Sequence, residues 1–280
     1  MSGTTPPESG ESATGAGVGT DAERLALKDI LRVRAPNPGP MTLSGTNTWV
    51  VGREPAWVVD PGPLLDVHME HVLEAIDERG GLGGVVLTHG HADHSDAVRS
   101  LIERRPAPLA AARGERDVAL AADTRFGPFQ AIPTPGHASD HFALVAAGAC
   151  FTGDAVLGEG SVFISPHPGA MAGYLAALEA LRERRDFDVL CPGHGPPVWD
   201  VAGKLSGYIE HRLARERALV AALDQGGRSV QALLDAAWPD VPAELRPAAT
   251  ATLAAHLDKL DDEGAVPPGV ERPSFEAFQW

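Results

Sequence analysis

Cysteine is scarce in this chain of 280 residues, which contains only Cys150 and Cys191. Two cysteines form at most one disulfide bond, so a small secreted domain held together by a disulfide framework is excluded. Both residues lie inside apolar runs, and we expect them to be buried as small hydrophobic side chains. Each also lies within a few residues of a motif described below, which leaves a place near a functional site open.

Long apolar runs are also missing. No stretch approaches the roughly 20 apolar residues that a membrane helix needs. Residues 1–20 are rich in Gly, Ser, Thr, Glu and Pro and lack the apolar segment of a signal peptide. We therefore expect a cytoplasmic protein with no membrane partner, and a disordered tail over residues 1–20.

The chain has no excess of basic residues. It contains 23 Lys and Arg against 38 Asp and Glu, and the formal net charge is −15. A protein that binds nucleic acid through phosphates needs a basic surface, so this balance disfavours RNA as a partner without excluding a local basic groove. The length allows one large domain, or a large domain with a small one.

Predicted strands and helices alternate through most of the chain. Turn residues such as Gly and Pro separate short apolar runs typical of strands from longer runs with helical spacing. Residues 22–33 fit either a short helix or a leading strand. This alternation predicts an α/β layered fold. The strands are expected at 47–52, 56–60, 84–87, 108–112, 129–134, 142–147, 150–152 and 187–191, and the helices at 64–79, 96–105 and 171–184.

The pattern changes near residue 204. Helices are predicted over 205–224, 230–237 and 245–262, followed by a segment rich in Pro and Gly. These features suggest a small appended domain over 204–280 that resembles a winged helix, after a main domain over 21–203. The appended domain has a net charge of −4, so we do not expect it to bind DNA. We expect it to pack against the main domain or to shape its entrance.

The histidines are placed unevenly. Of the 11 in the chain, His89, His91 and His94 fall close together, with Asp93 among them. Imidazole nitrogens suit zinc and other first-row metals. The cluster begins just past a predicted strand, where a loop containing Gly lets alternate side chains converge. We expect His89 and His91 to face one metal ion, and Asp93 and His94 to face a second.

Three later segments supply further ligands at the ends of predicted strands. His137 offers a third histidine for the first metal ion, and His194 offers a histidine for the second. Asp154 offers a carboxylate able to bridge two cations. Each of the three lies beside a glycine, which permits a tight turn and a close approach of the backbone to the metal ions.

The ordered set resembles the ligand series of the metallo-β-lactamase superfamily across roughly residues 40 to 200. The resemblance implies an αββα metallo-β-lactamase sandwich with a small C-terminal helical, winged-helix-like domain. It also implies that Asp60 supports the metal loop rather than binding metal. The implied metal ligands are His89, His91, Asp93, His94, His137, Asp154 and His194.

Two further segments narrow the resemblance. Residues 37–48 and the run Tyr208-Ile209-Glu210-His211-Arg212 are similar to β-lactamase-like proteins that carry a C-terminal winged helix. That group includes a mitochondrial single-strand endoribonuclease and fungal thioesterases that release polyketides from carrier proteins. Zinc β-lactamases proper lack a bridging carboxylate at the place of Asp154, so hydrolysis of antibiotics is disfavoured.

The expected function is metal-dependent hydrolysis. Two divalent cations, with zinc as the expected metal, would share a hydroxide and Asp154, while Asp93 orients the hydroxide and carries its proton to the leaving group. An ester, thioester or similar acyl compound, either a small molecule or linked to an acyl carrier, is the expected substrate. A single-stranded RNA endoribonuclease and a mono-iron enzyme similar to persulfide dioxygenases stay open as alternatives.

The remaining polar residues have more than one interpretation. His141 could support the metal loop or contact substrate, or it could be a structural cap. His167 fits an exposed loop better than the entrance to the site. Residues 42–48 could contact substrate or form turn hydrogen bonds. Four histidines on predicted helices are expected at the surface or in packing: His68, His71, His211 and His256.

Overall fold

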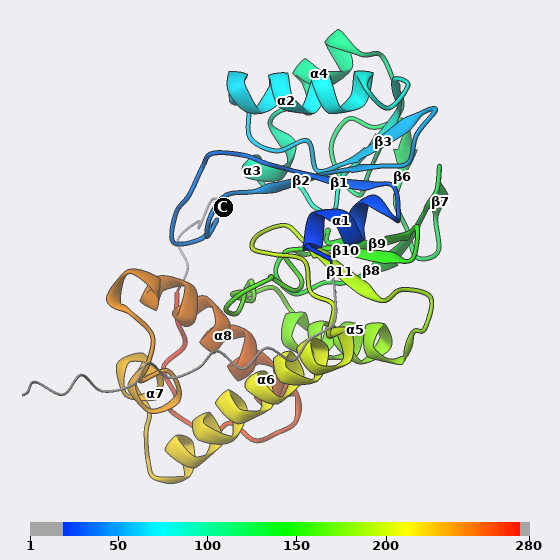
Figure 1. The fold of residues 1–280 in the computed structure, drawn as a ribbon. Coiled ribbons are helices and arrows are strands. Elements are labelled where there is room, and N and C mark those ends of the chain that lie inside the picture. The colour runs from blue at the N-terminus through cyan, green and yellow to red at the C-terminus, as the bar shows by residue number, and fades with distance from the viewer. Residues whose placement is uncertain (1–18, 275–280) are drawn as a thin grey trace, which may run out of the picture.

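The structure is a computed structural model that describes residues 19–274. Two β-sheets lie against each other, and helices cover the outer face of each sheet, which gives four layers (Figure 1). The α/β sandwich expected from the sequence is therefore confirmed. A disordered tail was expected over residues 1–20, and residues 1–18 of it lie outside the described residues. Thr20 is the N-cap of the first helix.

The first sheet has six strands in the order β1-β2-β3-β4-β5-β6. The strands β1 to β3 pair antiparallel, and β3 to β6 pair parallel. Helices α2 (Asp66–Asp77) and α4 (Val98–Arg104) cover its outer face. The strands are β1 (Ile30–Arg34), β2 (Asn47–Val51), β3 (Ala56–Val59), β4 (Leu82–Val86), β5 (Leu109–Ala111) and β6 (Val118–Ala119).

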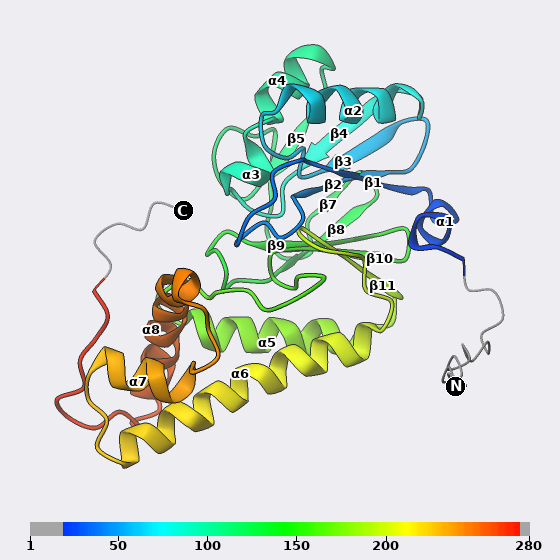
Figure 2. The same ribbon diagram turned by 60° about the vertical axis from the view of Figure 1, so that its left-hand side comes forward.

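The second sheet has five strands in the order β11-β10-β9-β8-β7. Its inner face packs against the first sheet through side chains such as Trp49, Phe129 and Phe151. Helix α5 (Ala170–Glu183) and the start of α6 cover the outer face, as Figure 2 shows. The strands are β7 (Arg125–Phe126), β8 (Phe129–Pro133), β9 (Phe142–Ala146), β10 (Ala149–Gly153) and β11 (Val189–Pro192).

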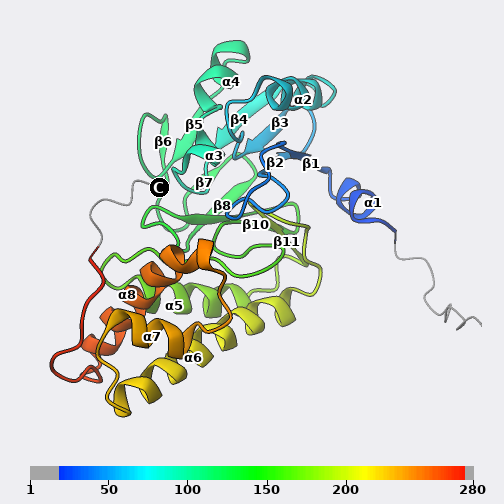
Figure 3. The same ribbon diagram turned by 90° about the vertical axis from the view of Figure 1, so that its left-hand side faces the viewer.

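Helix α6 (Val201–Asp224) connects two hydrophobic cores. Its first half places Leu205 in the core that α5 also lines, whereas Leu219 in its second half packs with the C-terminal helices. Those helices are α7 (Val230–Ala237) and α8 (Arg246–Asp262), joined through a short 3-10 helix at Ala243–Leu245, and α8 also packs on α5 (Figure 3). The boundary between residues 203 and 204 stays a prediction.

The structure differs from the sequence-based expectations mainly at the ends of elements. Residues 22–33 contain most of a helix, α1 (Asp21–Ala26), and most of a strand, β1, so both interpretations were partly correct. Helix α6 begins four residues before the expected start at 205 because the Asp200 side chain accepts a hydrogen bond from the backbone N–H of Gly203. The two-residue strands β6 and β7 were not expected.

Cys150 and Cys191 lie on the neighbouring strands β10 and β11, and both are fully buried with free thiols. Their interpretation as small buried hydrophobic residues is confirmed.

A separate observation concerns membranes. Within residues 19–274, none of the helices combines the length and the apolar character needed to cross a bilayer.

Candidate metal centre

Four loops meet at one edge of the sandwich and carry the residues singled out in the sequence. Each loop follows a strand, β4, β8, β10 or β11, so its position is fixed by the sheet. The short helix α3 (Ala92–Ser95) lies within the first loop. The structure brings all seven expected ligands together at this edge, in three overlapping groups whose donor atoms lie within 4.8 Å of one another.

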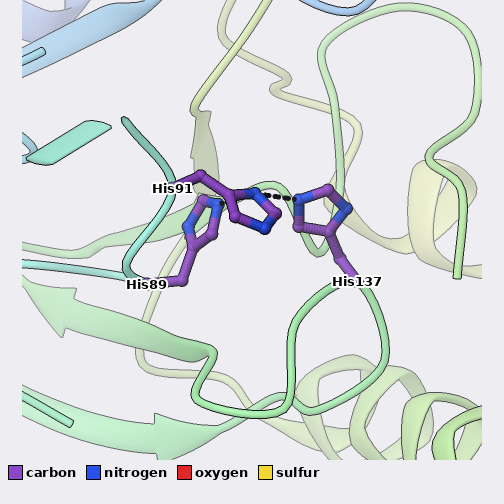
Figure 4. Close-up of side chains that lie close together, drawn as sticks. All are labelled: His89, His91 and His137. Atoms are coloured by element: carbon purple, nitrogen blue, oxygen red, sulfur yellow. Dashed lines mark hydrogen bonds between the residues drawn. The ribbon is translucent and has the colours of Figure 1, made fainter. Parts of the chain in front are cut away.

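The first group consists of His89, His91 and His137. His89 Nε2 lies 2.9 Å from His91 Nδ1, and His137 Nε2 lies 2.9 Å from the same nitrogen (Figure 4). One imidazole nitrogen carries at most one proton, so hydrogen bonding cannot satisfy three converging nitrogens well. A cation accepts lone pairs from three imidazoles at one point, which is the arrangement that these rings offer.

The second group consists of Asp93, His94 and His194, and the third, His89, His94 and Asp154, overlaps the other two. Asp93 Oδ2 lies 3.4 Å from His94 Nε2 and 3.3 Å from His194 Nε2. Asp154 lies between the two groups. Its Oδ2 atom is 3.5 Å from His137 Nε2 and 3.3 Å from His194 Nε2, and its Oδ1 atom is 3.4 Å from His94 Nε2. One carboxylate thus reaches ligands of both groups.

Two buried polar atoms in this centre have no hydrogen-bond partner among the residues that the structure describes. They are Nε2 of His94 and Oδ1 of Asp154, and the side chains that carry them are 0% and 9% exposed. Leaving such groups unsatisfied costs about 1–3 kcal/mol each, so native structures generally give them a partner. A divalent cation bound by both atoms would supply that partner. The residues present therefore fit the divalent metals that the fold family implies.

Asp60 holds the first loop from beneath. This residue follows β3, is 1% exposed, and accepts hydrogen bonds from the backbone N–H of Thr88 at 2.7 Å and from its hydroxyl at 2.6 Å. The Nδ1 atom of His94 lies 2.9 Å from the same carboxylate. An acceptor at Nδ1 leaves Nε2 of His94 free to bind a metal ion. These contacts agree with the supporting role expected for Asp60.

His141 supports the Asp154 loop. Its Nε2 atom accepts a hydrogen bond from the backbone N–H of Asp154 at 3.1 Å, so the proton of the neutral ring is on Nδ1, which donates to the Thr134 hydroxyl at 2.7 Å. The ring also stacks on His89 with centroids 4.9 Å apart. Of the interpretations left open for His141, support of the metal loop is the one that matches these contacts.

Two glycines leave room for the centre. Gly153 has φ +45°, and a Cβ atom there would lie 2.4 Å from the Thr88 hydroxyl. A Cβ atom on Gly193 would lie 2.4 Å from Asp154 Oδ1 and 2.6 Å from His94 Cε1. At both positions the backbone lies too close to side chains of the centre for a Cβ atom to fit, while the expected approach of the backbone to the metal ions stays a prediction.

Burial and charge divide the histidines into two kinds. Burial lowers the pKa of His89 well below its usual range and the pKa of His137 to about 4, so both rings are neutral near pH 7. Burial also opposes protonation of His194, but the carboxylate of Asp154 outweighs it and raises the pKa of His194 to about 9. A cation between Asp154 and His194 would displace that proton, because a ligand imidazole must be neutral.

The segment that follows Asp154 is held by helices outside the sheets. Tyr174 of α5 donates its hydroxyl hydrogen to Ala155 O at 2.6 Å, and the Tyr208 hydroxyl of α6 accepts from Leu157 N at 3.0 Å. On α8, the Thr252 hydroxyl accepts from Ile164 N at 3.0 Å. The C-terminal helices therefore fix the conformation of a loop that begins at a candidate metal ligand. Sequence reasoning missed these contacts.

A cavity of about 940 Å³ opens beside the centre. The candidate ligands His91, Asp93, His137, Asp154 and His194 line one part of it. Thr42 and Leu43 also line it, so the segment 42–48 considered for substrate contact reaches the cavity only at its start. The role of Thr46 is different, since its hydroxyl donates to Asp93 Oδ2 at 3.0 Å.

The other histidines divide as follows. His68 and His256 are fully buried and His71 is exposed. These positions agree with the expectation that they serve in packing or lie at the surface. His211 is half-buried and lines the cavity, a position that its helical spacing did not indicate. His167 does not line the described cavity, but it is half-buried rather than on a fully exposed loop.

Comparison with known protein families gave two matches along the chain. Residues 115–194 match the family described as Metallo-beta-lactamase superfamily. Residues 229–267 match the family described as Beta-lactamase associated winged helix domain, and this segment contains α7 and α8. The winged-helix resemblance of the C-terminal part is thereby confirmed.

Individual relatives are similar over most of their length. A Beta-lactamase-like protein 2 homolog from Caenorhabditis elegans is 29% identical, with 90% of this chain and 89% of the relative covered. An atrochrysone carboxyl ACP thioesterase from Aspergillus chevalieri is 30% identical, with 80% of this chain and 78% of the relative covered. The crystal structure of a metallo-beta-lactamase family protein from Thermus thermophilus matches with a TM-score of 0.68 and 22% identity, covering 85% of this chain and 95% of that one.

Proposed function

Because the chain belongs to the metallo-β-lactamase superfamily, we propose that it is a hydrolase with two divalent metal ions that acts on an ester, thioester or similar acyl compound. One observation carries the binuclear part of the proposal. The Asp154 carboxylate lies within 3.5 Å of histidine nitrogens from both ligand groups. A carboxylate within reach of both groups could bridge two cations, which supports a two-metal centre.

The proposed ligand sets follow from the two groups. His89, His91 and His137 would hold one cation, Asp93, His94 and His194 would hold the other, and Asp154 would bind both. Histidine nitrogens and carboxylate oxygens suit zinc, which we propose as the metal. When bound, such cations lower the pKa of water towards 7 and polarise a carbonyl oxygen.

Asp93 is proposed as the catalytic residue. Its side chain is 29% exposed and lines the cavity, so it can reach both the centre and a bound substrate. Burial works against ionisation of this carboxyl, but the hydrogen bond with His194 lowers its pKa to about 2, so it is a carboxylate near pH 7. The hydroxyl of Thr46 donates to Oδ2 and fixes its orientation. Asp93 would take the proton of the attacking water and pass it to the leaving group.

The substrate class is supported by a relative and by charge. The Aspergillus chevalieri relative is named as a thioesterase that acts on an acyl carrier protein. We propose an acyl compound of this kind, either free or linked to a carrier, for this chain. The net charge of −15 disfavours a polynucleotide.

The test combines metal analysis with a substrate panel. Purified protein is examined by elemental analysis and assayed with acyl thioesters, lactones and single-stranded RNA. We expect two zinc ions per chain and hydrolysis of the acyl compounds, and we expect Asp154→Ala to lose most of the metal and the activity. Asp96→Ala is the matched control, because Asp96 is an exposed carboxylate just after the first loop.

Several results would reject the proposal. Full activity with two bound metal ions in Asp154→Ala would contradict the bridging role. A single iron ion in the wild-type protein would favour a redox enzyme, and salt-sensitive cleavage of RNA, lost in Asp154→Ala, would favour a nuclease.

A further inference from the structure

The cavity beside the metal centre has a second wall, built by the C-terminal helices. Besides the candidate ligands, it is lined by Trp238 at the end of α7, Leu245 before α8, and Ala248 and Ala249 in the first turn of α8. These helices lie at the same end of the sandwich as α3 (Figures 1 and 2). At about 940 Å³, the cavity is near the upper end of the range for sites that enclose drug-sized ligands. An acetyl group would leave most of it unfilled.

The part of the second wall that α7, α8 and the segment between them supply is mostly apolar. Leu157 and Phe163, from the loop that follows Asp154, complete it from the catalytic side. Across the opening, Met41 lines the cavity while 40% of its surface is exposed, and among the described residues it is one of few large hydrophobic side chains left so accessible. Exposed apolar surface at the mouth of a cavity is typical of ligand-binding sites.

The basic residues along the wall are engaged by the protein itself. Lys204 donates to Gly158 O at 2.9 Å, and Arg212 donates to the Ser161 hydroxyl at 2.9 Å and to Val162 O. Arg215 forms a two-pronged ion pair with Asp240 at 2.6 and 2.8 Å. Burial lowers the pKa of His211 to about 4, so its ring is uncharged near pH 7. This wall therefore suits an uncharged group better than a chain of phosphates.

We propose that Trp238, Leu245, Ala248 and Ala249 form an acyl subsite, which selects apolar acyl groups much larger than acetyl. This inference rests on the proposed function, because it assigns the acyl half of the substrate to that wall. The reacting carbonyl would lie at the metal centre, and the apolar part of the acyl group would extend towards α8. Each methylene buried there should raise affinity roughly fourfold.

The experiment measures binding rather than turnover. Acetate, octanoate and 2-naphthoate, which are the acid products of simple acyl esters, are titrated into the full-length metal-loaded protein by calorimetry. We expect octanoate and 2-naphthoate to bind at least 100-fold more tightly than acetate. Ala248→Phe should reduce this ratio at least tenfold by filling the subsite.

Ala254→Phe is the matched control. Ala254 lies on the same helix with the same partial burial, but it lines a different hollow at the surface. Should Ala248→Phe fail to fold, Leu245→Ala serves as the second variant, and it should weaken octanoate several-fold while leaving acetate unchanged. Equal affinities for octanoate and acetate in the wild type, or equal losses in the Ala248 and Ala254 variants, would overturn the subsite.

A parallel assay keeps the two proposals apart. The acetyl, octanoyl and 2-naphthoyl thioesters are tested for hydrolysis with the same preparations. Tight octanoate binding that depends on Ala248, without hydrolysis of these thioesters, of the matching esters or of the lactones, supports the apolar subsite and rejects the proposed function. Hydrolysis that proceeds while all three acids bind equally rejects the subsite and leaves the proposed function supported.

Discussion

Replacing Gly193 with alanine would place a single methyl group against the metal centre. The backbone of Gly193 does not have the positive φ that would make alanine strained, so the change is steric. The new Cβ atom would lie 2.4 Å from Asp154 Oδ1 and 2.6 Å from His94 Cε1, whereas ordinary contacts begin at 3.4 Å. Asp154 must therefore move by about 1 Å, several times the roughly 0.2 Å tolerance of a metal–ligand distance.

We expect two consequences of Gly193→Ala. Overpacking of this kind lowers the free energy of unfolding by about 1–3 kcal/mol. The displaced carboxylate should also lower metal affinity at least tenfold, measured as metal retained after dialysis against a weak chelator. Gly90→Ala is the control, because its Cβ atom would meet only the end of the Asp140 side chain at 3.1 Å, and it should retain metal. Wild-type metal content and stability in Gly193→Ala would refute the reasoning.

Three further changes test the supports of the site. Asp60→Asn replaces an acceptor of His94 Nδ1 with an amide and should weaken metal binding about 10–100-fold, measured by competition with a chromophoric chelator; unchanged affinity would show that Asp60 does not orient His94. Thr252→Val leaves the buried N–H of Ile164 without its partner and should lower the free energy of unfolding by about 1–3 kcal/mol in urea titrations, with Thr250→Val as the more exposed control. Burial opposes ionisation of Glu216, but its hydrogen bonds with His256 and Lys259 lower its pKa below 4.5. The ionised Glu216 therefore stabilises the fold above about pH 4.5, and this stabilisation is lost as the pH falls through the lowered pKa. The difference in the free energy of unfolding between wild type and Glu216→Gln should shrink in acid. A difference that stays constant with pH would contradict this prediction.

The candidate ligands could be anticipated because their positions depend on local rules. Each follows a short apolar run that ends at a glycine or a polar loop, and the strand ends of a sheet fall along one edge. His137 and His194 are 57 residues apart in sequence, yet the same rule places both at that edge. The support from Asp60 was also accessible, because it too ends a strand.

The cavity wall could not be anticipated in the same way. Ala248 and Trp238 carry no local sign of a binding role, since alanine and tryptophan on amphipathic helices usually signal core packing. Their place depends on the angle at which α8 meets α5, a tertiary contact that no periodicity encodes. For the same reason the sequence did not indicate that Thr252 holds the loop after Asp154.

The continuity of α6 has a consequence for how such proteins diverge. As an unbroken helix of 24 residues it is about 36 Å long, and together with the packing of α8 on α5 it sets the distance and the angle between the metal loops and α8. Inserting one residue in its middle would turn everything after it by about 100° and carry Ala248 away from the opening. Substitutions within residues 229–267, in contrast, can remodel what fits the opening while the register of α6 stays intact. Changes of ligand preference should therefore accumulate as point substitutions after α6. Changes in the length of α6 should be tolerated only when they keep the residues after it in the same rotational register about the helix axis.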